Sequence, residues 1–177
     1  MAITKGLLVV LASYAVLALA KIYPLFLTFP QSGGVPSILL IPFILIIGVI
    51  SWLGRTFIAN QLSQRLFKAK AGFREELGNF GLVHFPLIFV GLSSMIIFVF
   101  GLSNIGIFAS LFLGMFFSLL MYTYFINVVM SSHKLNWKKG LLVIAVTEAI
   151  IAAAMLLLGL ITLHPLMQNS LMSMMAV

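Results

Sequence analysis

Cysteine and aspartate are both absent from this sequence of 177 residues, and only 7% of its residues are charged. The absence of cysteine excludes disulfides, thiolate metal sites and cysteine nucleophiles. The acidic residues are the glutamates Glu75, Glu76 and Glu148, and the sequence contains no phosphate-binding glycine loop and no zinc-binding helix pair. We therefore expect a protein that is not an enzyme and that binds no metal and no cofactor.

Two short stretches are similar to protease motifs, and neither is complete. The run Gly91-Leu92-Ser93-Ser94 is similar to an intramembrane serine-protease loop, but nothing in the sequence places His84 or His164 beside Ser93. The pair Glu75-Glu76 is similar to that of intramembrane prenyl-protein proteases. No arginine follows it at the required spacing, and the downstream histidine motifs are absent.

Hydrophobic residues dominate the rest of the chain. They make up 63% of the sequence, and the mean hydropathy is +1.24, far above that of a soluble domain. The formal net charge of +7 raises the question of nucleic acid, but the basic residues lie in short clusters between apolar runs. No basic face carries interleaved aromatic side chains. We therefore expect the lipid bilayer, and not nucleic acid, to surround this chain.

Five apolar runs are long enough to cross the hydrocarbon layer of a bilayer, which takes about 20 helical residues. They cover residues 6–29, 35–59, 80–102, 105–130 and 141–163. The sequence therefore predicts an all-α fold, a polytopic membrane helix bundle with about five transmembrane helices in a single domain over residues 1–177. The longest connection, residues 60–78, has an amphipathic pattern and is predicted to lie on the cytoplasmic side.

The first apolar run leaves its own end open. Residues 1–20 are similar to a secretory signal peptide, but apolar residues continue to Phe29, which favours a retained helix. Lys21 and Pro24 interrupt this run. The helix is therefore expected to end either near Ala20, with the following residues at the membrane interface, or near Phe29.

The positions of lysine and arginine predict the orientation, because cytoplasmic flanks of membrane helices retain positive charge. Apart from Arg55 within the second run and Lys21, the basic residues fall before the first run, between the second and third, and between the fourth and fifth. They are Lys5, Arg65, Lys68, Lys70, Arg74, Lys134, Lys138 and Lys139. The N-terminus is therefore predicted to lie in the cytoplasm and the C-terminus outside.

Four of these basic residues, Arg65, Lys68, Lys70 and Arg74, belong to the amphipathic connection. Two interpretations of this segment remain open. It is a cytoplasmic extension of the second helix followed by a segment that lies on anionic lipid at the membrane surface, or it is a docking surface for a partner protein.

Small residues recur at every fourth position in two of the predicted helices, so that each set forms one helix face. They are Ser110, Gly114 and Ser118 in the fourth helix and Ala145, Ala149 and Ala153 in the fifth. Such faces let helix backbones approach closely in lipid. We interpret both as helix-packing surfaces inside the bundle, with a homo-oligomer seam as the alternative.

Glu148 is the acidic residue of the fifth helix, nine residues after Lys139 and so about 13 Å deeper in the span. A carboxylate at this depth is costly and should be protonated or face a polar partner inside the bundle. His84, Asn127 and Arg55 lie at a similar depth in the other helices, and we expect Glu148 to form an intramembrane polar network with them. A proton- or substrate-coupled site is the alternative interpretation.

The stretch from Arg65 to Leu77, RLFKAKAGFREEL, is followed by Gly81 and by Pro86, where the third span should kink. This pattern resembles the Yip family, the Ypt/Rab-interacting protein domain. The resemblance covers residues 35–163, and the five-span layout agrees with it. The acidic motif and the long N-terminal region of eukaryotic relatives are absent, so the chain is similar to a compact bacterial member. The resemblance implies an accessory role in a bacterial cytoplasmic membrane.

Two functional hypotheses follow. The first is a non-enzymatic membrane scaffold or accessory protein that binds other membrane proteins; some bacterial relatives implied by the resemblance are associated with ABC-type exporters. The second is a small proton-coupled transporter or lipid-handling protein, in which Glu148, His84 and Pro86 line a polar route. We expect the two to differ in their dependence on the Glu148 carboxylate.

Overall fold

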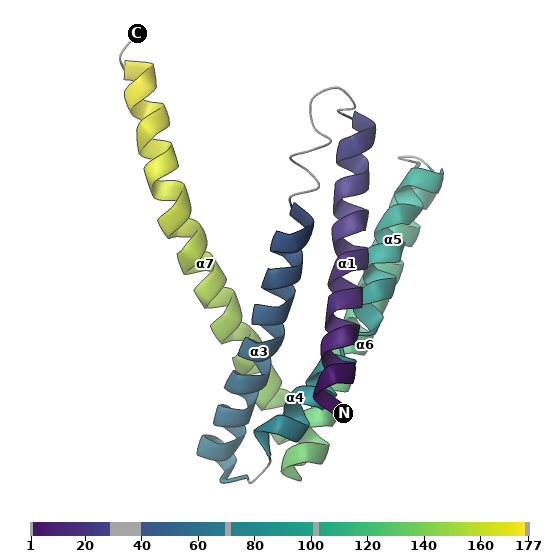
Figure 1. The fold of residues 1–177 in the computed structure, drawn as a ribbon, viewed down its shortest axis with the longest axis vertical. Coiled ribbons are helices and arrows are strands. Elements are labelled where there is room, and N and C mark those ends of the chain that lie inside the picture. Colours follow the sequence, from purple (N-terminus) through teal and green to yellow (C-terminus); the bar gives the residue numbers. More distant parts are fainter. Residues whose placement is uncertain (1, 29–39, 70–71, 101–102, 176–177) are drawn as a thin grey trace.

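The structure, a computed structural model, describes the backbone of residues 2–28, 40–69, 72–100 and 103–175. These residues form helices and no strand. In chain order the helices are α1 (Ala2–Thr28), α3 (Leu40–Phe67), α4 (Phe73–Leu82), α5 (Pro86–Phe100), α6 (Asn104–His133) and α7 (Trp137–Met175). The two ends of the chain lie at opposite ends of the bundle (Figure 1).

Among the residues that the structure describes, five segments are long and apolar enough to span a membrane: Ala2–Ile22, Leu40–Phe67, Phe73–Ile97, Asn104–His133 and Trp137–Leu158. The predicted all-α bundle with five membrane-spanning helices is therefore confirmed. The third span consists of two helices, because α4 ends at Leu82 and α5 begins at Pro86. Proline cannot donate a backbone hydrogen bond to the preceding turn, and residues 83–85 form a turn at this point.

The structure decides between the two ends expected for the first helix. α1 runs through Lys21 and Pro24 to Thr28, so the end expected near Phe29 is confirmed and the alternative near Ala20 is wrong. Proline removes only one helical hydrogen bond, and burial of Ala18, Ala20 and Ile22 to within 2% of full burial shows that packing continues past that point.

The connection predicted over residues 60–78 is much shorter in the structure. α3 continues to Phe67 and α4 already begins at Phe73, while Lys70 lies outside the described residues. The reason is that the polar residues at the end of α3 are partly internal: Asn60 and Ser63 are buried. Their hydrophilicity therefore reflects contacts within the bundle rather than exposure to water.

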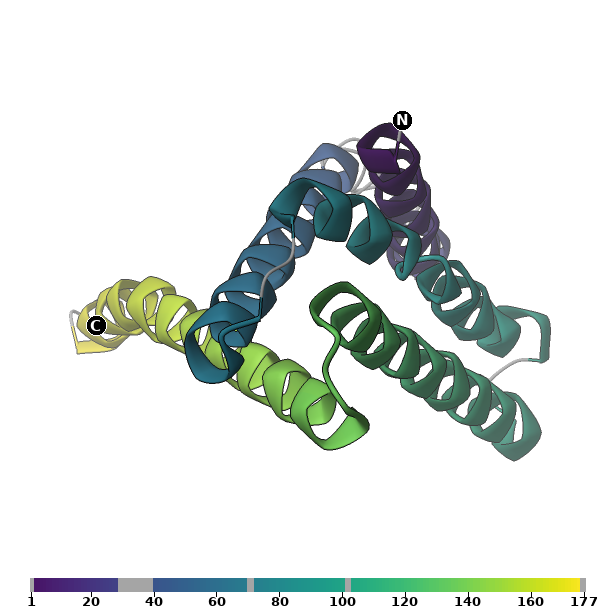
Figure 2. The same ribbon diagram turned by 90° about the horizontal axis from the view of Figure 1, so that it is seen from below.

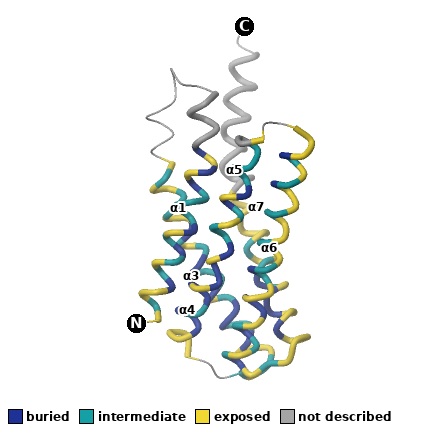
Figure 3. The backbone as a smooth tube through the Cα atoms, turned by 90° about the vertical axis from the view of Figure 1, so that its right-hand side faces the viewer, coloured by how far each residue is buried: buried dark blue, intermediate teal, exposed yellow. Residues whose placement is uncertain are grey.

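The core lies at the level of α4, which packs against α1, α3 and α6. α1 packs against α3, α4 and α5, and α6 packs against α5 and α7. The buried cluster includes Val10, Trp52, Phe80, Phe125 and Val143. Figure 3 shows buried segments of several helices converging at the level of α4. Away from this level α7 diverges from α3, as Figures 1 and 2 show.

Glycines let α1 and α4 pack with their backbones in contact. A Cβ atom on Gly81 would lie 2.4 Å from the Cα atom of Gly6, and a Cβ atom on Gly6 would lie 2.6 Å from the carbonyl oxygen of Gly78. No Cβ atom is found at such distances. Both helices are therefore held at a separation that only glycine permits, as in other close-packed membrane helices.

We expect Gly81→Ala to lower the free energy of unfolding by about 1–3 kcal/mol, the usual cost of overpacking, because the atoms in its way are backbone atoms. Chemical unfolding of the purified protein in detergent measures this loss. Gly54→Ala is the matched control, since its Cβ atom would meet nothing within 4 Å and alanine favours helix. Equal stability of the two variants would contradict the packing explanation.

Candidate functional site

An ion pair joins α3 and α7 within their membrane spans. The Nε atom of Arg55 lies 2.7 Å from the Oε1 atom of Glu148, and Nη2 of Arg55 donates to Oε2 at 3.2 Å. The remaining nitrogen, Nη1, donates to the Ser51 hydroxyl at 2.6 Å. The guanidinium group is thus bidentate, the geometry that makes arginine–carboxylate pairs strong. The predicted contact between Glu148 and Arg55 is present in the structure.

This ion pair is well inside the span but is not sealed. Glu148 lies eleven residues after Trp137, the start of α7, or about 17 Å along the helix. The side chain of Arg55 is 15% exposed and that of Glu148 is 24% exposed. Charges in contact with hydrocarbon are costly. The exposed edge of the pair therefore identifies a place where a second polar or protein surface would be favoured.

His84 lies near this ion pair without bonding to it. The guanidinium carbon of Arg55 is 5.9 Å from the centroid of the Phe125 ring, and the His84 ring meets the same phenyl ring edge-on at 5.4 Å. The Nδ1 atom of His84 is 2.9 Å from the Phe80 carbonyl oxygen. Its Nε2 atom is buried and has no hydrogen-bond partner among the described residues.

Asn127 does not join the network, which corrects the prediction. It is exposed on α6 and lines a surface groove with Asn79, Tyr124 and Ser131. Asn127 follows the buried Phe125 by two positions, and residues two apart on a helix do not share a face. Asn127 was placed at the depth of Glu148, but its side chain lies on another face of α6, away from the ion pair.

A second polar cluster, which the sequence did not predict, is centred on the buried Glu76 of α4 and reaches the surface at Gln64. The Oε1 atom of Glu76 lies 2.9 Å from Nε2 of His133, and its Oε2 atom accepts from Nδ2 of Asn60 at 2.5 Å. Gln64 donates to Oδ1 of Asn60 at 2.6 Å. The side chains of Glu76 and His133 are both 0% exposed. This cluster, which we call the Glu76 cluster, ties α3, α4 and α6 together.

The sequence held one signal for the Glu76 cluster. Asn60 and Gln64 are four residues apart, as are Glu76 and Phe80, so each pair shares a helix face. That signal was hidden by the basic residues around Glu76, which indicated an exposed segment. The buried Oγ atom of Ser63 and the Nδ1 atom of His133 have no hydrogen-bond partner among the described residues.

The two small-residue faces have opposite surroundings. On α6, Ser110 is buried and a Cβ atom on Gly114 would lie 3.3 Å from the Ser93 hydroxyl of α5, so this face packs inside the bundle. Ser118 is half-buried and donates to the Gly114 carbonyl oxygen at 2.8 Å. On α7 the alanines are all exposed, so their predicted packing inside the bundle is wrong. They are Ala145, Ala149 and Ala153.

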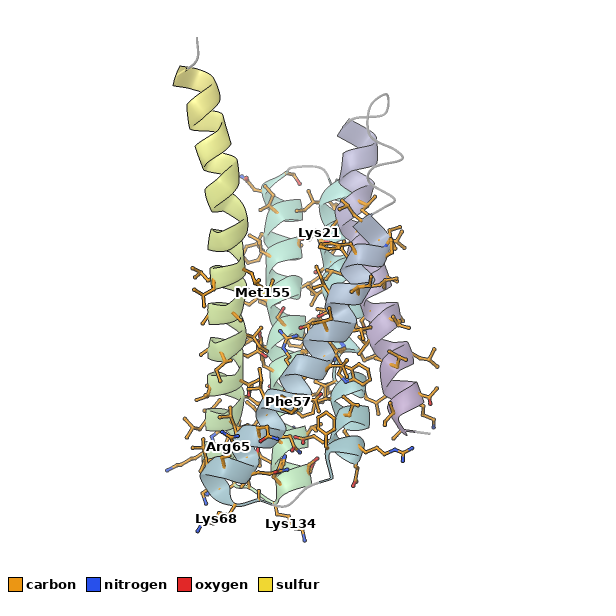
Figure 4. All side chains as sticks on the ribbon, turned by 60° about the vertical axis from the view of Figure 1, so that its left-hand side comes forward. Lys21, Phe57, Arg65, Lys68, Lys134 and Met155 are labelled. Carbon is orange, nitrogen blue, oxygen red and sulfur yellow. The ribbon has the colours of Figure 1, made fainter. Side chains whose placement is uncertain are left out.

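The predicted basic contacts lie at the end of the bundle that contains α4. Arg65, Lys68 and Arg74 are exposed, and Figure 4 shows Arg65, Lys68 and Lys134 together at this end, far from Lys21. We call it the basic end. The Nζ atom of Lys139 lies 5.2 Å from the centroid of the Phe67 ring, which joins the start of α7 to the end of α3.

The described residues contain no group of three histidine, cysteine or acidic side chains that could bind a metal ion. Ser93 donates its hydroxyl proton to the carbonyl oxygen of Val90 at 2.8 Å. The polar groups that the described residues bring together are therefore the partly exposed ion pair and the largely buried Glu76 cluster. No family model, no curated protein and no solved structure matches this sequence. The Yip resemblance, carried partly by Gly81 and Pro86, stays a prediction.

Proposed function

We propose that the protein is a non-enzymatic, integral membrane accessory protein that binds another membrane protein through one face of α7. This α7 face consists of Ala145, Ala149, Ala152 and Ala153, all of which are exposed. The exposure of this face carries the proposal. Small residues let membrane helices approach closely, and the equivalent face of α6 is already used for packing on α5.

The Arg55–Glu148 ion pair adds a polar contribution at the same place. Glu148 lies three residues after Ala145 and four before Ala152, so it borders the α7 face. A partner helix seated on that face would cover the exposed edge of the carboxylate. Exposing the carboxylate to hydrocarbon costs free energy in the isolated chain. Covering it with a partner helix removes part of that cost and so favours association.

The partner and the membrane are proposals that rest on the sequence. The distribution of basic residues supports a cytoplasmic basic end, with the N-terminus inside and the C-terminus outside. The Yip resemblance supports a bacterial cytoplasmic membrane and an ABC-type exporter as the partner. The exposed cations Lys68 and Arg74 would then face the cytoplasmic parts of that partner.

A proton-coupled transporter or lipid-handling protein is the second candidate. Its supporting observation is the buried, unpartnered Nε2 atom of His84 close to the ion pair. We rank it second because Glu148 already binds Arg55 through both carboxylate oxygens. A carboxylate that carries protons across the span must leave such a partner in each cycle.

We expect Ala149→Trp to lower the recovery of a stoichiometric partner by about tenfold, which corresponds to about 1.4 kcal/mol, because an indole ring would hold the partner helix away from α7. The measurement is affinity purification from native membranes in mild detergent, with mass spectrometry. Phe112→Trp is the control, since Phe112 is 54% exposed on α6.

Full retention of the partner by Ala149→Trp would contradict the proposed α7 face. Recovery of the chain alone from unaltered membranes would contradict the accessory role and favour the transporter. Recovery of the chain only with further copies of itself would assign the α7 face to a homo-oligomer instead.

A further inference from the structure

A groove between α3 and α7 lies at the membrane-facing surface and leads to the basic end. It encloses about 370 Å³ and is lined by Phe57, Ile58, Gln61, Leu62, Arg65 and Ile150. Arg65 is its one charged residue and Gln61 its one amide. The others are apolar, and Phe57 and Ile150 are 56% and 43% exposed. The groove therefore has a polar end and an apolar remainder.

This division follows the depth of the bilayer. Arg65 is two residues from Phe67, where α3 ends, whereas Ile58 lies about 10 Å further along the helix, at 1.5 Å per residue. Figure 4 shows Arg65 nearer the basic end than Phe57. Phe57, Gln61 and Arg65 are spaced by four residues and form one row along α3. The groove thus runs from headgroup depth into acyl-chain depth.

The guanidinium group of Arg65 is free to bind an anion. Within the described part of the chain the carboxylate of Glu148 contacts Arg55 and that of Glu76 contacts His133, so Arg65 is in neither contact. Lys68 is exposed three residues further on, and Lys139 lies beside Phe67. Both add positive charge at the same end. Arginine binds phosphate through two parallel hydrogen bonds that are strengthened by the opposite charges of the two groups.

We propose that this groove binds one anionic phospholipid, with its phosphate on Arg65 and Gln61 and an acyl chain along Phe57, Ile58, Leu62 and Ile150. A lipid fits this groove better than a protein helix does. The cation lies at headgroup level, where it can bind a phosphate, and the apolar walls lie deeper, where they can bind an acyl chain. Basic pockets between membrane helices are known to hold anionic headgroups. The site adjoins the α7 face, because Ile150 and Ala153 are three residues apart, but five of its six lining residues belong to α3.

The test is native mass spectrometry of the detergent-solubilised chain, titrated with phosphatidylglycerol or with phosphatidylcholine. We expect one phosphatidylglycerol to bind in preference to phosphatidylcholine. Arg65→Ala should weaken phosphatidylglycerol binding about fivefold, the contribution of one basic residue near the surface. Arg74→Ala, which removes the same charge from an exposed position of α4 outside the groove, should leave phosphatidylglycerol binding nearly unchanged.

A second variant tests the apolar part of the site without changing charge. Ile58→Trp fills the groove and should displace the lipid, whereas Leu53→Trp, at an exposed position of α3 outside the groove, should not. Circular dichroism checks that each variant stays helical. Equal binding of the two lipids, equal losses in Arg65→Ala and Arg74→Ala, or unchanged binding in a helical Ile58→Trp would each overturn the proposal.

Discussion

Replacing Glu76 with alanine is expected to lower the free energy of unfolding by about 2–6 kcal/mol, because it leaves two buried hydrogen-bonding groups unsatisfied at about 1–3 kcal/mol each. The variant would leave the Nε2 atom of His133 and the Nδ2 atom of Asn60 without their acceptors. Neither group can turn to water, because both residues are buried. Denaturant titration of the purified protein in detergent, followed by circular dichroism, measures the loss.

Glu75→Ala is the control for that experiment, because Glu75 is the exposed neighbour on the same helix. Surface changes of this kind usually alter stability by no more than about 0.5 kcal/mol. Glu76→Gln should fall between the two, since its single oxygen can accept from His133 while its amide group meets the donor of Asn60. Similar stabilities for Glu75→Ala and Glu76→Ala would show that the Glu76 cluster contributes little.

The contacts of Glu76 hold a short helix in place. α4 is a short helix of ten residues, too short to be stable alone in solution. Glycine contacts hold one of its sides against α1, and the Glu76 cluster holds another against α3 and α6. Trp52 adds a hydrogen bond from Nε1 to the Leu77 carbonyl oxygen at 3.0 Å. Because α4 is held in this way, the turn before Pro86 and the position of His84 within it are fixed as well.

Hydropathy was sufficient to predict the spans, because about 20 apolar residues are a long and redundant signal. It failed at the α3–α4 connection, where single polar side chains decide the structure. Asn60 and Glu76 look hydrophilic in sequence whether they face water or each other. Whether they face water or each other depends on how closely α3 and α4 approach in space. The residues next to them in the sequence do not indicate that approach.

The sequence predicts the depth of a residue in the membrane better than the helix face on which its side chain lies. Counting residues from the basic flanks placed Glu148 and Arg55 at compatible depths, and the structure joins them. The same counting placed Asn127 there as well, although α6 turns it away. The small-residue faces repeat this lesson: their spacing is identical in α6 and α7, yet one packs inside and the other is exposed. Helix rotation is set by the whole bundle.

The second large effect is expected for the ion pair itself. Arg55→Met should lower the free energy of unfolding by about 3–5 kcal/mol, because the Glu148 carboxylate would stay in the span without a cation. Glu148→Met should cost less. Arg55 would retain the Ser51 hydroxyl and the Phe125 ring, and its long aliphatic stem lets the charged group reach toward polar surroundings.

The double variant Arg55→Met/Glu148→Met should be more stable than Arg55→Met alone, because an apolar pair of similar volume often replaces an ion pair at little cost. The same denaturant titration gives the coupling energy from the four proteins. Losses that simply add would show that the two side chains do not depend on each other.

Glu148→Gln separates the two candidate functions. Partner recovery should survive in an accessory protein whose bundle still folds, whereas proton-coupled transport in reconstituted vesicles should be lost. A transport signal abolished by this change, with partner recovery intact in the same protein, would move the function from the α7 face to the Glu148 carboxylate.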